Sequence, residues 1–281
     1  MPRSSALVLG SFTLALVAPA SAHAQSVYRM VETNVKNTAG DMWSVWTAPA
    51  RGSAKDWAIA AAAIGSAALV SVFDDDVDRW AVRHRDDRMW SVLSPMRQGG
   101  AAFSGRTITP VAVGLFAVSL IAKNERMQEG IFGCVSGYAA TSLVRTYAMY
   151  PLIGRQRPDS GRGIQPPPAR QGDQYHFTLP GSTNWGMHSL PAGHFANVAS
   201  CATFLTDRFS MGKFVEPAVY AIAAGVGLGR TLDRRHWLSD TVLSFAFAYA
   251  TGRQVSIRSS ERERRSRREE ARLSRGEGLP R

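Results

Sequence analysis

The stretch from Gly229 to Asp240 reads GRTLDRRHWLSD and contains an arginine, a histidine and an aspartate at short, regular intervals. His236 follows Arg230 by six positions, and Asp240 follows His236 by four. Residues four apart share one face of a helix, so we expect Asp240 to hold one imidazole nitrogen of His236 and to leave the other free. Arg230 offers a planar fork of donors that suits phosphate. Taken alone, the stretch is equally compatible with a surface helix that starts among scattered charges.

Two upstream stretches add the same kinds of residue. The segment GRQRP at 154–158 places Arg157 directly before a proline, and the segment PAGH at 191–194 places His194 after a Pro-x-Gly turn. Proline suits the first turn of a helix, glycine lets the backbone come close to an anion, and a helix N-terminus attracts negative charge. We therefore expect the backbone at Gly193 to bind an anion and His194 to meet a leaving group.

Together the three stretches resemble the motifs of the type 2 phosphatidic acid phosphatase superfamily, which includes class A bacterial acid phosphatases and vanadium haloperoxidases. The family pattern is K-x6-R-P, P-S-G-H and S-R-x5-H-x3-D, and here 32 and 34 residues separate the corresponding stretches. The resemblance covers residues 110–252 and implies an all-α bundle of about six core helices. It implies roles in catalysis for His236, His194 and Asp240, and in phosphate binding for Arg157, Arg230 and Gly193.

Three positions depart from the family pattern. The family lysine falls on Tyr150, and the serines of the second and third motifs fall on Ala192 and Gly229. Each lost donor predicts a site weakened or retuned by about ten- to a hundredfold. Arg155 is a candidate to replace the missing lysine charge. Since all the residues that carry the core chemistry are present, we expect an altered but active enzyme.

The resemblance implies a phosphatase that hydrolyses a phosphomonoester or pyrophosphate through a phosphohistidine on His236. Arginine supplies the positive charge, so neither a metal nor a cofactor is expected. Candidate substrates include lipids such as phosphatidic acid, an isoprenoid pyrophosphate or a lipid A phosphate. Two alternatives stay open. One is a non-catalytic envelope protein on the same scaffold, which Tyr150 and Ala192 favour. The other is a vanadium-dependent haloperoxidase, which would lack the lysine and serine of the family's vanadate site.

The chain divides into four predicted parts. Residues 1–24 are typical of a signal peptide, with an early arginine, an apolar stretch and a small-x-small cleavage site. An N-terminal helical region at 25–106 and the phosphatase-like core at 107–252 follow, and a basic tail occupies 253–281. A signal peptide predicts export and a periplasm-facing protein. The apolar runs are shorter than the roughly 20 residues that a membrane span needs, so embedding stays open.

Six apolar runs predict the core helices, at 57–73, 107–122, 130–144, 191–205, 216–229 and 236–251. Cys134 and Cys201 lie inside two of these runs. They could pair in an oxidising compartment, but we expect two buried thiols. The acidic residues between Asp74 and Asp78 follow the first run, and we expect a solvated helix end there rather than a metal site.

The chain is basic, with 33 lysines and arginines against 22 acidic residues and a net charge of +11. The tail contributes ten arginines and five glutamates. We expect a solvated tail that is partly helical or disordered. The alternative is attraction to an anionic membrane surface. A nucleic-acid partner is not expected for an exported chain.

Overall fold

The computed structural model describes residues 22–84, 95–96, 105–159 and 172–275. The predicted signal peptide therefore lies almost wholly outside the described residues. The described chain divides after Asn37 into two compact units, and the candidate site residues all belong to the second. The helices are α1 (Ala22–Trp46), α2 (Ala54–Ser71), α3 (Asp74–Arg83), α5 (Gly105–Ile121), α6 (Glu125–Val144), α7 (Tyr150–Leu152), α8 (Gly193–Arg208), α9 (Val215–Leu232) and α10 (Leu238–Ser274).

The all-α prediction is confirmed, and each predicted apolar run corresponds to one helix: α2, α5, α6, α8, α9 and α10. Among the described residues, the strands are limited to β1 (Gly154–Arg155) and β2 (Phe177–Thr178). They form an antiparallel pair in which Gly154 faces Thr178. Short 3-10 helices at Ala48–Arg51 and Trp185–Met187 and a π-helix at Arg145–Met149 complete the elements.

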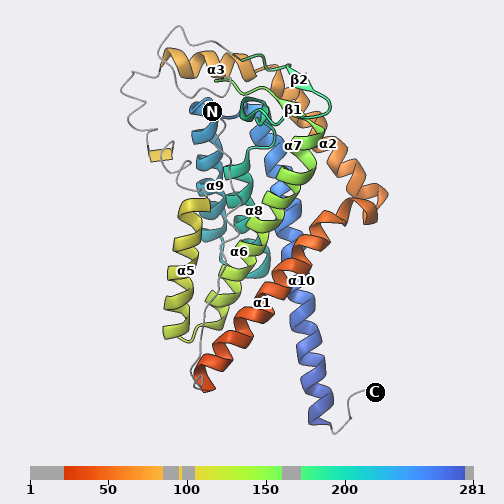
Figure 1. The fold of residues 1–281 in the computed structure, drawn as a ribbon, viewed down its shortest axis with the longest axis vertical. Helices are drawn as coiled ribbons and strands as arrows, with labels where there is room; N and C mark the ends of the chain where they lie inside the picture. The colour runs from red at the N-terminus through yellow and green to blue at the C-terminus, as the bar shows by residue number, and fades with distance from the viewer. Residues whose placement is uncertain (1–21, 85–94, 97–104, 160–171, 276–281) are drawn as a thin grey trace. The chain divides into compact units, whose positions relative to one another are not determined.

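Helix α8 occupies the centre of the bundle and packs against α6, α9 and α10 (Figure 1). Its buried face is built from small residues, including Ala196 and Ala199. A Cβ atom on Gly252 of α10 would lie only 2.3 Å from the Ser200 carbonyl oxygen of α8. Glycine is thus required where these two backbones meet. This central position matters because α8 begins at the predicted phosphate site.

Cys134 of α6 and Cys201 of α8 form a disulfide, so the prediction of two free thiols was wrong. The two helices approach so closely that a Cβ atom on Gly133 would meet the Phe204 ring at 2.0 Å. The Cα atoms of the two cysteines are consequently 4.4 Å apart, within reach of a disulfide. Spacing along the chain could not reveal this approach.

The acidic segment at the start of α3 is not simply a solvated helix end. Asp74 and Asp78 are buried and form ion pairs with Arg155 and Arg234, whereas Asp76 pairs with Arg79 at the surface. The prediction fails for the two buried aspartates, because arginines far along the chain fold back onto them. Among the described residues, no cluster of metal-binding side chains occurs there or elsewhere.

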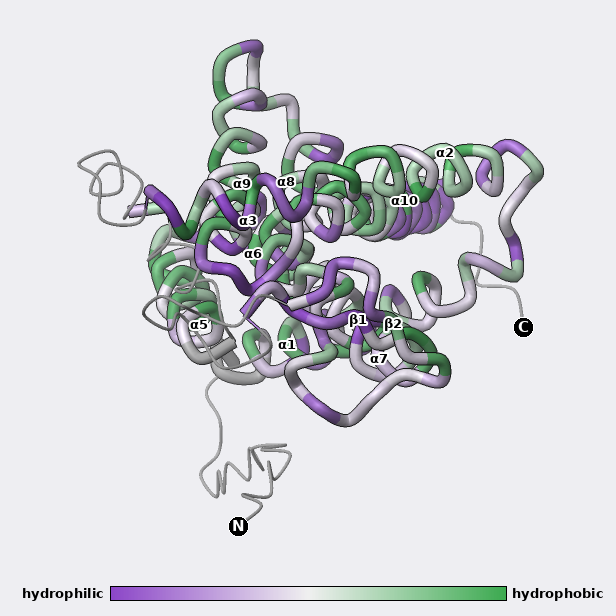
Figure 2. The backbone as a smooth tube through the Cα atoms, turned by 90° about the horizontal axis from the view of Figure 1, so that it is seen from above, coloured by the Kyte–Doolittle hydropathy of each residue, from purple (hydrophilic) through white to green (hydrophobic). Residues whose placement is uncertain are grey.

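The basic tail continues α10 without a break as far as Ser274, so it is helical over most of its length. Its first part packs against the bundle through Arg262, which pairs with Asp41 at 2.6 Å, and through Glu263, which accepts from Arg208 at 2.5 Å. Figure 2 shows that the distal end of α10 is strongly hydrophilic. The predicted boundary at residue 253 therefore falls within one continuous helix.

Within the described ranges, no single helix is both long and apolar enough to cross a membrane. Helices α2 and α3, bent by 48° at their junction, meet the length and composition criteria only as a pair.

Candidate active site

His236 lies in the turn between α9 and α10 and precedes the first residue of α10. Arg234 holds this turn in shape. Its backbone has a positive φ of 59°, and its guanidinium donates to Asp78 at 2.7 and 2.9 Å and to the Pro158 carbonyl at 3.1 Å. The prediction that His236 and Asp240 share one helical face was wrong, because His236 precedes the helix that contains Asp240. Asp240 instead accepts the Trp237 amide at 2.9 Å, and so caps the start of α10.

The imidazole of His236 is only 2% exposed, and its Nδ1 lies 2.6 Å from the carbonyl oxygen of Ser189. A carbonyl can only accept a hydrogen bond, so Nδ1 carries the proton and Nε2 keeps its lone pair. The predicted free nitrogen is therefore present, but the acceptor is the Ser189 carbonyl instead of Asp240. Asp240 contacts His236 only indirectly, through Ser189. It accepts a hydrogen bond from the Ser189 hydroxyl at 2.5 Å.

Arg155 contacts this arrangement through Asp240, and its guanidinium is occupied by hydrogen bonds to buried groups. Its guanidinium donates to Asp240 at 2.5 Å and to Asp74 at 2.8 Å, and the Ser239 hydroxyl accepts a further bond at 2.8 Å. All these groups are buried. The suggestion that Arg155 replaces the missing family lysine was consequently wrong, since two carboxylates neutralise its charge.

His194 occupies the first turn of α8, directly after Gly193. The N-cap residue of α8 is Ala192, whose side chain cannot accept a bond from the helix amides, and the first turn carries no acidic residue. The amide of Ala192 itself donates to the Ser244 hydroxyl at 2.7 Å. The start of α8 thus lacks the usual side-chain cap, and the uncapped amides of a helix N-terminus attract anions.

Arg157 follows β1 and is 5% exposed. Its Nε and Nη2 donate to the His188 carbonyl at 3.3 and 3.0 Å, and its guanidinium lies 3.5 Å from the centroid of the Trp185 ring. Within the described residues, its buried Nη1 has no hydrogen-bond partner. A buried donor without a partner is uncommon and makes Arg157 a candidate for binding a ligand.

Arg230 lies in the last turn of α9 and is 8% exposed. Its closest carboxylate, Asp233, lies at the outer limit of a hydrogen bond, 3.5 Å from Nη1. The buried Nε of Arg230 has no partner in the described part of the chain. Two unused arginine donors, from Arg157 and Arg230, therefore accompany the two histidines.

The electrostatic influences on the histidines place these groups in one cluster. The pKa of His194 is lowered to about 4, first by burial and then by the positive charges of Arg230, Arg145, Arg157 and Arg235. The pKa of His236 lies well below its ordinary value because of burial and the charges of Arg157 and Arg230. The hydrogen bond to the Ser189 carbonyl acts in the opposite direction and raises this pKa. Burial also lowers the pKa of Arg157 to about 10. Both imidazoles are therefore neutral at pH 7 in the free protein.

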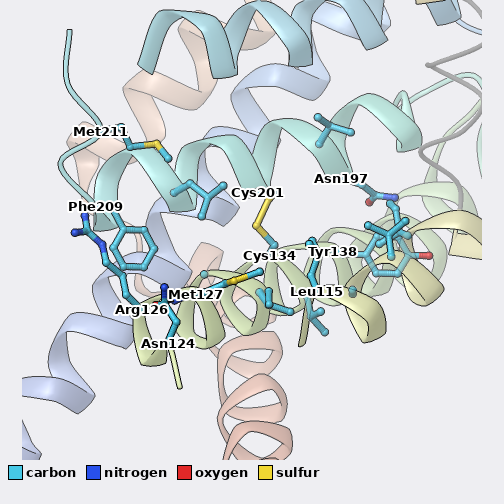
Figure 3. A pocket seen from close by; sticks show the side chains of 18 of the residues that line it. Leu115, Asn124, Arg126, Met127, Cys134, Tyr138, Asn197, Cys201, Phe209 and Met211 are labelled. Carbon is cyan, nitrogen blue, oxygen red and sulfur yellow. Dashed lines mark hydrogen bonds between the residues drawn. A yellow bond between two sulfur atoms is a disulfide. The ribbon is translucent and has the colours of Figure 1, made fainter. Parts of the chain in front are cut away.

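A second feature is an apolar cavity of about 920 Å³ between α5, α6 and α8 (Figure 3). Figure 3 shows Tyr138 and Asn197 at one end, Phe209 and Met211 at the other, and the disulfide between them. Asn197, which lines the cavity, lies about one helical turn along α8 from His194. Among the described residues that line it, Arg126 and Tyr138 are the titratable side chains.

Sequence reasoning missed Ser189 and Arg145. Ser189 acts through its backbone carbonyl, and a carbonyl has no signature in the residue type. Arg145 ends an apolar run in which it resembles an ordinary helix-terminal cation. Its proximity to Gly193 becomes visible only in the folded chain.

Comparisons with known proteins agree with the motifs. Residues 129–264 match the family model of the PAP2 superfamily. A 66-residue segment is 33% identical to the lipid A 1-phosphatase of Porphyromonas gingivalis and covers 23% of this chain and only 15% of that protein. The fold is similar to that of a transmembrane PAP2 type phosphatidylglycerolphosphate phosphatase from Bacillus subtilis, with a TM-score of 0.45, 16% identity, and coverage of 72% of this chain and 96% of that one. Residues 129–264, which contain every residue of the candidate site, are therefore similar to the PAP2 superfamily.

Proposed function

We propose that this chain is a metal-independent phosphatase that hydrolyses a phosphorylated lipid through a phosphohistidine on His236. One observation carries the proposal above the others. Two buried arginines with unused donors accompany a histidine whose Nε2 keeps its lone pair. Such donors bind the oxygens of a phosphoryl group and stabilise the charge that develops as it is transferred.

In the first step, Nε2 of His236 attacks phosphorus while the bond to the leaving oxygen breaks. Arg157, Arg230 and the amide at Gly193 bind the non-bridging oxygens. His194 gives its proton to the leaving alkoxide. A bound phosphate anion raises the pKa of His194 from the value of about 4 in the free site, because negative charge favours the imidazolium form.

In the second step, neutral His194 takes a proton from water, and the water oxygen attacks the phosphohistidine. The N–P bond breaks, inorganic phosphate leaves, and His236 regains its lone pair. The Ser189 carbonyl keeps the proton of His236 on Nδ1 throughout, so the same nitrogen is available for the next cycle.

The apolar cavity supports a lipid as substrate. It begins one helical turn from His194, and its lining is almost entirely hydrocarbon. An acyl or isoprenoid chain can fill this space while its phosphate occupies the arginine–histidine cluster. The basic distal half of α10 and the exposed apolar side chains of α2, α5 and α9 support contact with an anionic membrane. The disulfide supports an oxidising, periplasm-facing location.

The test is phosphate release by the purified chain in the presence of a chelator. The substrates are a soluble aryl phosphate, phosphatidic acid and an isoprenoid pyrophosphate. We expect release that His236→Ala abolishes and that is fastest with a lipid. His176→Ala is the matched control, because His176 is exposed and outside the cluster. A folded protein that releases no phosphate from any substrate would favour the non-catalytic alternative, and vanadate-dependent halide oxidation would favour the haloperoxidase.

A further inference from the structure

The site contains a third arginine for which the motifs give no role. Arg145 begins the π-helix at Arg145–Met149, where α6 ends. A π-helix inserts one extra residue per turn and often marks a functional position. The position of the family lysine is occupied by Tyr150, whose ring stacks on His188 at 4.2 Å and brings no positive charge. Arg155 is neutralised by Asp74 and Asp240.

The guanidinium of Arg145 lies directly on the first turn of α8. A Cβ atom built on Gly193 would be 1.8 Å from Nη1 of Arg145 and 2.7 Å from its Cζ. Any side chain at position 193 would therefore displace the guanidinium. The absence of a Cβ at Gly193 allows a cation to reach the helix amides that are expected to bind phosphate.

This placement is electrostatically unfavourable without a ligand. The N-terminus of α8 carries the positive end of the helix dipole, and Arg157 and Arg230 add their charges to the same cluster. In the described part of the chain, no carboxylate pairs with Arg145 and no side chain accepts a hydrogen bond from it. An anion bound between like charges in a partly buried site relieves their repulsion.

We propose that Arg145 is a further phosphate-binding residue, which supplies from the end of α6 the positive charge that Tyr150 lacks. Its planar fork donates to the same non-bridging oxygens that the amide at Gly193 contacts. This inference rests on the proposed function for its consequence in catalysis. The binding itself does not need turnover, so it can be tested separately.

The direct test is calorimetric binding of inorganic phosphate to the full chain. We expect Arg145→Ala to weaken phosphate binding by about ten- to a hundredfold, the range for a lost charge-assisted contact. Arg145→Lys should recover part of the affinity, because it keeps the charge but loses the fork. Gly193→Ala should resemble Arg145→Ala, since the added methyl group displaces the guanidinium. Arg253→Ala on α10 is the matched control, because Arg253 is exposed and outside the cluster.

A phosphate affinity for Arg145→Ala within twofold of the parent chain would overturn the proposal. An equal loss in Arg253→Ala would also overturn it, because the effect would then come from net charge. If Arg145→Ala does not fold, Arg145→Lys is judged by the same twofold limit. Should the parent chain bind phosphate through Arg145 yet release none from any substrate, this inference stands and the proposed phosphatase activity fails.

Discussion

Two groups of arginines lie close together in this protein and differ in whether carboxylates neutralise them. The first group is paired with carboxylates: Arg155 with Asp74 and Asp240, Arg234 with Asp78, and Arg235 with Asp159. The second group consists of Arg145, Arg157 and Arg230, and its members have donors that the described residues leave unused or only weakly engaged. The paired arginines fix the backbone that carries His236. The second group is the one that we propose to bind phosphate.

The comparison predicts that the two groups fail in different ways. Removing a partner from a buried ion pair leaves an uncompensated charge and destabilises the fold. Removing an unpaired cation from a site of like charges eliminates repulsion, so the fold keeps its stability while ligand binding suffers. Measurements of stability and of activity on the same variants should therefore separate the groups.

The largest expected effect is on stability, in the paired group. Asp78→Asn should lower the free energy of unfolding by about 3–5 kcal/mol, because Arg234 would keep a buried and unpaired charge. Urea denaturation followed by circular dichroism measures this value. Asp76→Asn is the matched control, since the Asp76 carboxylate is 69% exposed and pairs with Arg79 at the surface. Its effect should stay below about 1 kcal/mol. Equal effects of the two changes would contradict the structural role of the Asp78–Arg234 pair.

The next effect is on activity, in the second group. Arg157→Lys should lower kcat/KM by about a hundred- to a thousandfold, because one donor of the transition-state site is lost together with the fork. Steady-state phosphate release from a soluble aryl phosphate measures it. The same variant should lose about 1–2 kcal/mol of stability, because the bonds to the His188 carbonyl are weakened, which is less than the loss for Asp78→Asn. Near-normal activity, or a large loss of stability, would place Arg157 in the paired group instead.

The disulfide gives a smaller effect that belongs with the structural side of the comparison. Replacing both Cys134 and Cys201 by serine should lower the free energy of unfolding by about 2–4 kcal/mol, because the bond closes a long loop between α6 and α8. Hydrolysis of the aryl phosphate should change little, since Cys201 lies about two helical turns from His194. A loss of kcat/KM comparable to that of Arg157→Lys would show that the disulfide positions the site.

The smallest effect concerns pH. The pKa of His194 is about 4 in the folded protein, against an ordinary value of 6.5 in the unfolded chain. Between these values the unfolded chain binds the extra proton, so the contribution of His194 to stability is fully present above pH 6.5 and is lost as the pH drops towards 4. The slope is at most about 1.4 kcal/mol per pH unit for one histidine. His194→Asn should reduce this slope, measured by urea denaturation from pH 7 to 4.5, whereas the exposed control His176→Asn should not.

The fold was largely predictable, because each core helix is a run of apolar residues and the local sequence determines such runs. The composition of the site was also predictable from motif spacing, which identified His236, His194, Arg157 and Arg230. Their surroundings were not. The partner of Arg234 is Asp78, which lies 156 positions away in the chain. Pairings at such separations, like the disulfide and the contact of Arg145 with Gly193, depend on how the helices pack.

The role of Asp240 shows the same limit in detail. Its spacing from His236 predicted direct contact on a helix, but α10 begins only at Leu238. Asp240 caps that helix and accepts the hydroxyl of Ser189, whose carbonyl then holds His236. The motifs predicted which residues lie near His236, and the order of their contacts required the structure.

The central claim is that His236 is the nucleophile of a phosphoryl transfer, and the most direct measurement is to trap the covalent intermediate. The parent chain would be mixed with an aryl phosphate, quenched in alkali within milliseconds, digested, and analysed by mass spectrometry. We expect one added phosphoryl group on the peptide that contains His236, and none in His236→Ala or in chain quenched without substrate. Phosphate release at a normal rate with no phosphorylated peptide, or with phosphate on His194 instead, would contradict it.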